Sequence, residues 1–544
     1  MIVINAVGAS EGISVGTLVA RKKDKREITK IYVENFESEI DRYIKAKSEV
    51  IDRLEKMYQN TLKNCGEKEA ELFKVHQMML DDDSYHGSVL DLIKSERQNA
   101  EYAIKTSSQK LVDMFSQMED GYMQSRAEDV ISISRMLIDS LMGNELSSLK
   151  NIAPGSILFA DELNAGEISE IKKAGVGGLI TPSGSPTSHA SILARVMGIP
   201  TIVGIGDQLK DEFFGKLIII DGSSGGMYIE PDEETYHRFV IKIKDISSQN
   251  ENLEKLRGKR SVTKDGKNID VYANLNNPNE IDEVLKSDAE GIGLFRTEFL
   301  YLGRNSYPTE DEQFGVYKNI AQKMQGKKII VRTLDIGSDK QEKYMNFAKE
   351  ENPALGYRGI RVCLKEIDIF KTQLRAIYRA SAFGNFSIMF PMITSLGEIR
   401  MAKKIACEVQ SELLNLGVPF ANNVPIGVMV ETPSAAVLSD LLAKEADFFS
   451  IGTNDLTQYT LALDRQGSNV AGDFSDATEA VLRLIEFSVK NAHENGISVG
   501  VCGEMASDTS LMPRLLEAGV DEFSVSPRFV LRARERVNSY SKKI

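Results

Sequence analysis

Hydrophobic residues change their spacing along the chain, and the change lies near residue 262. Before that point, residues 36–62 carry apolar side chains at steps of three and four, the spacing of one buried helical face. Similar spacing continues through ELFKVHQMML and VISISRMLIDSLM. These segments predict a helical bundle of about four elements. The apolar positions of the first segment are Phe36, Ile40, Tyr43, Ile44, Val50, Ile51, Leu54, Met57, Tyr58 and Leu62.

Short β-rich runs lie on both sides of this helical region. VGASEGISVG precedes it, and GSILFADELN, GVGGLITPSGS, IPTIVGIG and KLIIIDGSSGGMYIEP follow it, each interrupted by Gly, Pro or Asp-Gly. We predict one α/β domain made of residues 1–30 and 148–232, with a helical domain of residues 31–147 inserted into it. The charged stretch at residues 233–260 predicts a linker helix.

From residue 261 to residue 544, short apolar runs alternate with helical segments. The eight runs are IDVYANL, GIGLFRTE, KIIVRTLDIG, SIMFPMI, IGVMVET, FFSIGTND, ISVGVCGE and EFSVS. Eight strand–helix repeats over a segment of this length are typical of a (β/α)8 TIM barrel, in which the active site lies at the C-terminal ends of the strands. The predicted class is therefore α/β, and a doubly wound open sheet is the structural alternative.

The composition is that of an ordinary soluble protein, with 42% hydrophobic and 27% charged residues among 544. This length exceeds one hydrophobic core, so about three domains are expected. The sequence contains no apolar run of the roughly 18–20 residues that cross a membrane, and its start lacks the basic segment of a signal peptide. We expect a cytoplasmic protein without membrane insertion. The four cysteines show no CxxC spacing, which argues against a zinc site or a disulfide framework.

The net charge is −13, which disfavours binding to the phosphate backbone of nucleic acids. The charge is unevenly distributed. Residues 34–145 contain 23 acidic and 14 basic residues, an excess of nine negative charges in the predicted helical domain. Such a run is more often a solvated face than a binding surface.

Polar residues follow the apolar part of five predicted strands of the barrel. Because parallel strands end on the same face, we expect these side chains to converge. Any one of them could be a structural ion pair, but five strands together favour a functional site. The residues are Arg296, Glu298, Arg332, Asp335, Glu431, Asn454, Asp455, Cys502 and Glu504.

The residue types in this group favour phosphoryl transfer. Arg296 and Arg332, together with Arg465 on the helix after GTNDL, suit a substrate with several negative charges, because guanidinium groups bind phosphate and carboxylate with two hydrogen bonds. Glu431 and Asp455 offer only oxygen ligands, which favours Mg²⁺. Phosphoryl transfer depends on neutralising charge in this way.

Two further residues carry candidate chemistry. Cys502 is either a small buried hydrophobic residue or, at a strand end, a proton donor. His189 lies among small residues in TPSGSPTSHASILARVMG, near the predicted start of a helix with Thr187 or Ser188 as N-cap. A lone histidine there is usually only a hydrogen-bond donor. His189 is expected to be exposed, and the barrel is predicted to bind anions. Together these two expectations favour a more specific hypothesis, in which His189 lies on a separate domain and is phosphorylated.

Two long motifs, GSPTSHASILAR and DFFSIGTNDLTQYTLALDR, resemble the enzyme I family of the phosphoenolpyruvate-dependent sugar phosphotransferase system. The resemblance extends over essentially the whole chain. It implies that His189 is the phosphohistidine, that Mg²⁺ is held by Glu431 and Asp455, and that Cys502 is the proton donor that yields pyruvate. It also implies the following contacts to phosphoenolpyruvate: Arg296, Arg332, Arg358, Asn454 and Arg465.

The resemblance further implies transfer of the phosphoryl group from the histidine to the carrier protein HPr, the first step of sugar transport by this system. The acidic helical domain would then steer a basic partner. A homodimer through the barrels is implied as well. The candidate contacts to HPr are Glu67, Glu71, Met79, Asp82 and Arg126.

The sequence departs from the family pattern near His189. Ser185 and Pro186 replace a glycine and an arginine, and Ile168 stands where the family has a threonine. These changes bear on the geometry of the loop and leave the nucleophile in place.

Two alternatives remain at this point. A pyruvate phosphate dikinase or phosphoenolpyruvate synthase shares both motifs but needs an additional nucleotide-binding domain. A non-catalytic homologue that only binds partners would have no chemical reason to keep His189, the arginines, both metal ligands and Cys502.

Overall fold

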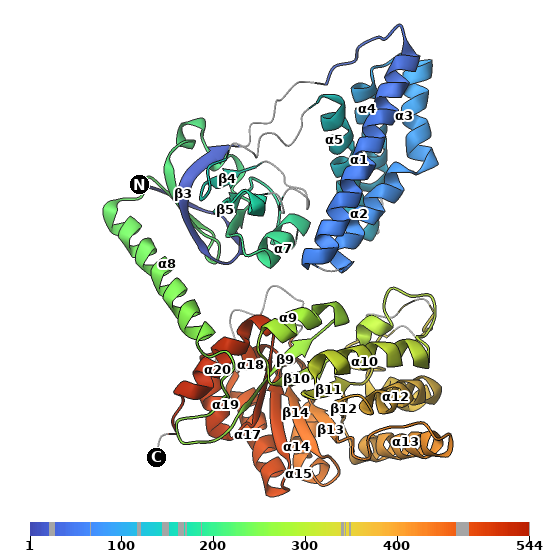
Figure 1. Cartoon of the computed structure of the whole chain (residues 1–544), viewed down its shortest axis with the longest axis vertical. Coiled ribbons are helices and arrows are strands. Elements are labelled where there is room, and N and C mark those ends of the chain that lie inside the picture. Colours follow the sequence, from blue (N-terminus) through green and yellow to red (C-terminus); the bar gives the residue numbers. More distant parts are fainter. Residues whose placement is uncertain are drawn as a thin grey trace. The chain divides into compact units, whose positions relative to one another are not determined.

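The computed structural model describes the chain except for residues 21–27, 66, 117–120, 144–151, 161–167, 169–170, 187, 339–341, 343, 348–349, 464–477 and 543–544. The chain forms two compact units, Met1–Ser248 and Gln249–Ile544 (Figure 1). Helix α8, Glu233–Glu254, includes the point at which the units divide. In the described part of the chain, no helix has the length and apolar character needed to cross a membrane.

The first unit contains an eight-stranded sheet in the order β1-β8-β7-β3-β4-β5-β6-β2. Strands β3, β4, β5 and β6 run parallel, and the other pairs are antiparallel. Helix α7, His189–Val196, lies between β5 and β6 in the sequence. The strands are β1 Ile2–Asn5, β2 Val7–Ser10, β3 Ile13–Ala20, β4 Ile157–Phe159, β5 Gly178–Ile180, β6 Thr201–Val203, β7 Leu217–Asp221 and β8 Gly226–Ile229.

The helical region is inserted between two strands that pair directly. The chain leaves the sheet after β3 and returns as β4, which pairs with β3 in parallel. This confirms the inserted helical bundle, whereas the domain boundaries given above stay predictions. The described helices of the insertion are α1 Phe36–Cys65, α2 Glu67–Leu80, α3 Asp83–Ser95, α4 Ala100–Ser116 and α5 Gly121–Leu141.

The described part of the bundle has five helices, where the sequence predicted about four. One expected position of the buried stripe was wrong. Ile44 is 48% exposed and lies outside the buried stripe, whereas Tyr43, Val50 and Leu54 are buried. Tyr43 and Ile44 are adjacent, and only one of them points to the core at this step of the helix.

The second unit is a closed barrel of eight parallel strands, and each strand coincides with one of the eight predicted runs. The open-sheet alternative is therefore wrong. The strands are β9 Asp270–Leu275, β10 Gly291–Phe295, β11 Lys328–Arg332, β12 Asn385–Phe390, β13 Ile426–Val430, β14 Phe448–Gly452, β15 Ser498–Cys502 and β16 Glu522–Val525.

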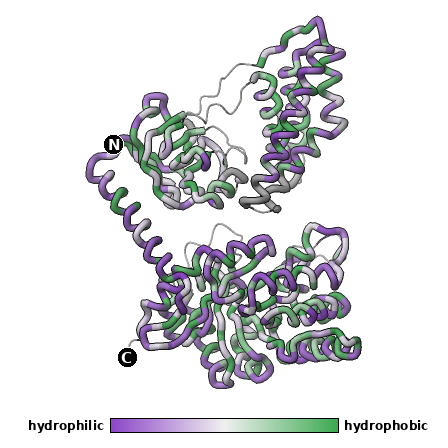
Figure 2. Tube along the Cα trace, in the orientation of Figure 1, coloured by the Kyte–Doolittle hydropathy of each residue, from purple (hydrophilic) through white to green (hydrophobic). Residues whose placement is uncertain are grey.

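Helices surround the barrel and bury its outer face (Figure 1). Their hydrophobic residues face the strands and their polar residues lie outward, so purple and green alternate along these helices in Figure 2. Two of them begin with a capping box, formed by Thr309 and Glu312 in α10 and by Ser395 and Glu398 in α13. The helices are α9 Ile281–Lys286, α10 Glu310–Met324, α11 Ile360–Lys365, α12 Ile367–Ser381, α13 Leu396–Asn415, α14 Pro433–Val437, α15 Ser439–Leu442, α16 Thr453–Leu461, α17 Thr478–Glu494, α18 Glu504–Ser507, α19 Met512–Ala518 and α20 Val530–Ser539.

Candidate active site at the barrel mouth

Polar side chains from five strands meet at the carboxyl end of the barrel. Arg332 and Cys502 are the last residues of β11 and β15, and Glu431 directly follows β13. Asp455 lies in the first turn of α16, which begins immediately after β14, and Arg296 follows β10. Closure of the barrel brings these positions together, although up to about 200 residues separate them in the sequence.

Asp335, three residues after β11, is the centre of a charge network at this mouth. Its two carboxylate oxygens accept hydrogen bonds from Nε and Nη2 of Arg358 at 2.8 and 2.9 Å. Nη1 of Arg332 lies 2.9 Å from Asp335 Oδ2. Asp335 is 5% exposed, so these charges are paired where little water screens them. The two-point contact with Arg358 fixes the orientation of both side chains.

The two arginines also reach further carboxylates. Arg332 Nη2 donates to Glu298 Oε1 at 2.6 Å, and Arg358 Nη2 donates to Asp455 Oδ2 at 3.0 Å. Arg358 Nη1 donates to the Tyr459 hydroxyl at 3.2 Å. Arg332 is 8% exposed, and its Nε has no hydrogen-bond partner among the described residues. An unpaired buried N–H group is a donor available to an anion.

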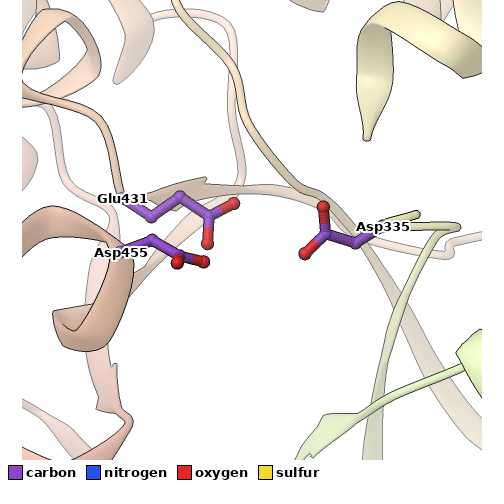
Figure 3. A group of neighbouring side chains, drawn as sticks. All are labelled: Asp335, Glu431 and Asp455. Atoms are coloured by element: carbon purple, nitrogen blue, oxygen red, sulfur yellow. The ribbon is translucent and has the colours of Figure 1, made fainter. Parts of the chain in front are cut away.

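Three carboxylates of this network form a candidate metal site. Figure 3 shows Glu431 and Asp455 beside each other and Asp335 opposite them, with the carboxylates directed toward one another. One oxygen of each lies within 4.8 Å of the others. With Glu298, four carboxylates accompany two guanidinium groups, which leaves an excess of negative charge for a cation. Oxygen-only ligands suit a hard divalent cation.

Glu431 is held at this site by the backbone of Met392. The Met392 N–H donates to Glu431 Oε1 at 2.6 Å, and Met392 has a φ of 57°, in the left-handed region that a non-glycine residue rarely adopts. Such a conformation persists only when its surroundings enforce it. Burial, and then the charges of Asp335 and Asp455, raise the pKa of Glu431 well above its usual range.

Cys502 lies below this network in the barrel interior. It is 1% exposed and packs in an apolar cluster. Its Sγ accepts a hydrogen bond from Ser450 Oγ at 3.6 Å and donates to the Ile451 carbonyl at 3.5 Å. Burial raises the pKa of the Cys502 thiol to about 11. The thiol is therefore protonated at neutral pH, as a proton donor requires.

The burial of Cys502 leads to a prediction for thiol modification. At pH 8 a thiol with a pKa of about 11 is about 0.1% thiolate, and only the thiolate reacts. We expect iodoacetamide to label the exposed Cys407 at least about 100-fold faster than Cys502, as measured by peptide mass spectrometry. Equal labelling rates for these two cysteines in the folded protein would contradict the burial of Cys502.

Arg296 and Asn454 lie at the same end of the barrel and have hydrogen-bond partners. Arg296 Nη1 donates to Asn276 Oδ1 at 2.8 Å. Asn454 Oδ1 accepts from the backbone N–H of Glu504 at 2.8 Å. A Cβ at Gly503 would lie 2.7 Å from this amide oxygen, and Gly503 has a φ of 96°. Glycine is thus required at the turn that joins β15 to α18.

His189 is the first residue of α7, in the other unit. Ser188 is the N-cap, and its Oγ accepts from the Ser191 N–H at 3.4 Å, in agreement with the sequence-based prediction. The loop before the helix is held by two backbone carbonyls. Ser191 Oγ donates to the Ser185 carbonyl at 2.8 Å, and Arg195 Nη2 donates to the Pro186 carbonyl at 3.0 Å.

The remaining predicted residues are placed as follows. Arg465 lies outside the described residues, and Glu67 and Glu71 belong to α2 without described side chains. Met79 is partly buried against the bundle core. Asp82 caps α3 by accepting from the backbone N–H groups of Ser84 and Tyr85. Arg126 Nη1 donates to Asp129 Oδ2 at 2.8 Å.

Comparison with known proteins assigns the chain to a family. Family models match residues 5–126 (PEP-utilising enzyme, N-terminal), 152–225 (PEP-utilising enzyme, mobile domain) and 250–542 (PEP-utilising enzyme, PEP-binding domain). The phosphoenolpyruvate-protein phosphotransferase of Priestia megaterium is 39% identical over 539 residues, which cover 99% of this chain and 94% of that protein. The chain belongs to the phosphoenolpyruvate-protein phosphotransferase family.

Other members show the same extent of similarity. The phosphoenolpyruvate-protein phosphotransferase of Bacillus subtilis (strain 168) is 39% identical over 540 residues, covering 99% of this chain and 95% of that protein. The protein of the same name from Mycoplasma capricolum is 41% identical over 531 residues, covering 98% of this chain and 92% of that protein.

The structure shows what the residues near His189 that depart from the expected family pattern contact. Ser185 and Pro186 contact α7 through backbone carbonyls, which residues of other types also provide. Ile168 is fully buried, and its side chain has no polar atom to offer a histidine. Two backbone carbonyls of the loop therefore accept hydrogen bonds from side chains of α7.

Sequence reasoning grouped Asp335 with the strand-end residues but assigned it no role, and it did not identify Tyr459. Asp335 is the residue that joins Arg332, Arg358 and the acidic group. The available signal was an acidic side chain in RTLDIG, three residues after a buried strand. Its pairing with Arg358 was not visible, because that arginine lies in a loop between β11 and α11.

Proposed function

We propose that this transferase moves the phosphoryl group of phosphoenolpyruvate to His189 and then to HPr, and that it releases pyruvate. The observation that carries the proposal is the network of Arg332, Asp335 and Arg358 beside three carboxylates, in a chain similar to phosphoenolpyruvate-protein phosphotransferases over its full length. The relatives that match 99% of this chain are phosphoenolpyruvate-protein phosphotransferases, which favours this function over the dikinase alternative.

The roles of the residues follow from their chemistry. Arg296, Arg332, Arg358, Asn454 and Arg465 are proposed to hold the phosphate and carboxylate of the substrate. A neutral imidazole nitrogen of His189 attacks phosphorus, the N–P bond forms, and the bond between phosphorus and the enolate oxygen breaks. The thiol of Cys502 then gives its proton to C3 of the enolate to form pyruvate.

We propose Mg²⁺ as the cation of the acidic site, with Glu431 and Asp455 as its ligands. The oxygen-only donor set and the excess of negative charge fit this ion. When bound, Mg²⁺ supplies Lewis-acid stabilisation of the charge that develops on the substrate oxygens. Asp335 pairs with both Arg332 and Arg358 and would orient these two side chains for the substrate.

The raised pKa of Glu431 predicts that Mg²⁺ binding releases a proton. Glu431 binds a proton more tightly than an ordinary carboxyl group, and a ligand carboxylate must lose it. We expect calorimetric titrations of Mg²⁺ in buffers of different ionisation enthalpy to report release of protons on binding, in an amount that decreases as pH rises. The Glu431→Gln variant should release fewer protons per ion than the parent protein. Equal release from both proteins would contradict this role of Glu431.

The partner and the assembly are part of the proposal. The acidic helical domain is suited to a carrier with basic residues around its histidine. We propose Glu67, Glu71, Met79, Asp82 and Arg126 as its contacts, a homodimer through the barrels, and a cytoplasmic location. Asp82 also caps α3, so its replacement affects helix stability as well as binding.

The test uses phosphoenolpyruvate labelled with ³²P. The purified chain is incubated with it and Mg²⁺, and protein-bound phosphate is examined for the acid lability and base stability of phosphohistidine. We expect label on the parent protein and none on His189→Ala. The matched control is His237→Ala, because His237 is exposed on α8 and should leave labelling unchanged.

Addition of HPr with a free histidine should then remove the label from the enzyme and transfer it to HPr. Absence of label on the parent protein would overturn the proposed function and favour a partner-binding homologue. Label that remains on the enzyme after addition of HPr would overturn only the choice of acceptor.

A further inference from the structure

The barrel interior contains a carboxyl group that has no part in the mechanism above. Glu522 begins β16, is 8% exposed, and its Oε1 has no hydrogen-bond partner among the described residues. Burying a polar group without a partner costs free energy. A buried carboxyl group is therefore unfavourable for stability at this position, and we ask which chemical role it could have.

Two glycines make room for this carboxyl group. A Cβ at Gly293 of β10 would lie 2.7 Å from Glu522 Oε1, and a Cβ at Gly500 of β15 would lie 3.0 Å from it. Oε1 therefore occupies the space that side chains at these two positions would fill. The carboxyl group points into the barrel interior, over Gly500.

The strand register connects Glu522 with Cys502. Gly500 pairs with Ser450 of β14 on one side and with Glu522 of β16 on the other. Ser450 Oγ donates to Cys502 Sγ at 3.6 Å. Gly500 has no side chain, so no side chain of β15 stands between Glu522 and Ser450 at this level of the barrel.

The surroundings of Cys502 separate its sulfur from bulk water. Its immediate neighbours in the barrel interior are apolar side chains, and Ser450 is the polar side chain that contacts it. After the thiol gives up its proton, the buried thiolate needs a proton donor nearby. The neighbours are Leu294, Ile330, Met389, Met429 and Phe448.

We propose that Glu522 returns a proton to Cys502 through Ser450 after each turnover. The proposal rests on the proposed function, in which Cys502 protonates the enolate. The Ser450 hydroxyl gives its proton to the thiolate sulfur. The carboxylic acid of Glu522 gives its proton to a bridging water molecule, which gives one of its own protons to the Ser450 oxygen. The resulting carboxylate regains a proton from solvent water. Glu522 is thus a positioning and relay residue that does not touch substrate.

The charges around Glu522 support this direction of transfer. The groups that act on it are Lys328, Asp270 and Asp521. Burial raises the pKa of Glu522 to about 8, Lys328 opposes the increase, and the two aspartates add to it. Glu522 is therefore protonated at neutral pH, and it is still a stronger acid than the Cys502 thiol, whose pKa is about 11. Proton transfer from the carboxyl group to the thiolate is favourable.

The test compares two exchange reactions that need no phosphoryl acceptor. The chain is incubated in D₂O with Mg²⁺, phosphoenolpyruvate and ¹⁴C-pyruvate. Exchange of carbon label between the two compounds reports reversible phosphorylation, and deuterium in the methyl group of pyruvate reports the arrival of solvent protons at Cys502. The informative quantity is the amount of deuterium incorporated per carbon exchange.

We expect Glu522→Gln to lower this ratio at least about tenfold while carbon exchange continues, because the amide holds no transferable acid proton. Ser450→Ala should lower the ratio in the same way, and it serves as the second variant if Glu522→Gln does not fold. The matched control is Glu535→Gln, since Glu535 is exposed on α20 and the same chemical change there should leave the ratio unchanged.

The other outcomes are distinguishable. An unchanged ratio in Glu522→Gln and Ser450→Ala would overturn the relay, and so would an equal decrease of both exchanges, which is the signature of structural damage alone. Absence of carbon exchange in the parent protein would overturn the proposed function and, with it, the relay.

Discussion

Replacement of Asp335 by alanine is expected to lower the free energy of unfolding of the barrel by about 3–5 kcal/mol, the usual cost of breaking a buried ion pair on one side. Asp335 contacts both Arg332 and Arg358 at 2.8–2.9 Å, and its side chain is 1% exposed. Its removal takes away the carboxylate that pairs with both buried guanidinium groups and leaves each of them with one carboxylate partner, Glu298 for Arg332 and Asp455 for Arg358. Urea unfolding monitored by circular dichroism measures this loss.

The same substitution should lower phosphorylation by phosphoenolpyruvate about 100-fold, because both arginines lose the group that orients them. Asp335→Asn keeps the shape and part of the hydrogen bonding, so its effect on stability should be smaller.

The control is Asp311→Ala. Asp311 also pairs with an arginine, Arg379, at 2.8 Å, but its side chain is 85% exposed. An exposed pair of this kind contributes little, so stability should change by less than about 0.5 kcal/mol. Similar losses for Asp335→Ala and Asp311→Ala would show that Asp335 is not the centre of a buried network.

Replacement of Glu522 by glutamine is expected to stabilise the protein, and the gain should increase with pH. In the unfolded chain the carboxyl group ionises near pH 4.5, whereas in the folded protein it stays protonated up to about pH 8. Between these values the folded state binds more protons, so the parent protein loses stability as pH rises. Through this group, the free energy of unfolding of the parent protein falls by at most about 1.4 kcal/mol per pH unit. The glutamine variant has no carboxyl group at this position and lacks this contribution.

From pH 5 to pH 8 the difference between variant and parent should therefore increase by about 3 kcal/mol in favour of the variant. Urea unfolding at several pH values measures it, and comparison with the parent cancels the titration of all other groups. A difference that stays constant across this range would mean that Glu522 ionises normally and is not a reservoir of protons. If Glu522→Gln is more stable than the parent protein and incorporates less deuterium per carbon exchange, then the buried carboxyl group of Glu522 lowers stability but contributes to catalysis.

The elements of the barrel could be predicted from the sequence because their signals are local. Each of the eight apolar runs is short and bounded by polar residues, and the strands coincide with them. Ser188 was predictable as a cap because its role depends on residues within one helical turn. The strand-end residues, Arg332 and Glu431 among them, could be grouped because a parallel barrel places all such positions on one face.

Other features depend on which strands become neighbours, and the tertiary structure alone decided them. The pairing of Asp335 with Arg358 joins a strand end to a loop. The space over Gly500 that holds Glu522 exists only because β14, β15 and β16 pair in one register. The sequence by itself determined the elements, the strand-end chemistry and the family resemblance, since these depend on neighbouring residues. The charge network and the buried acid depend on barrel closure, which brings distant residues within hydrogen-bonding distance.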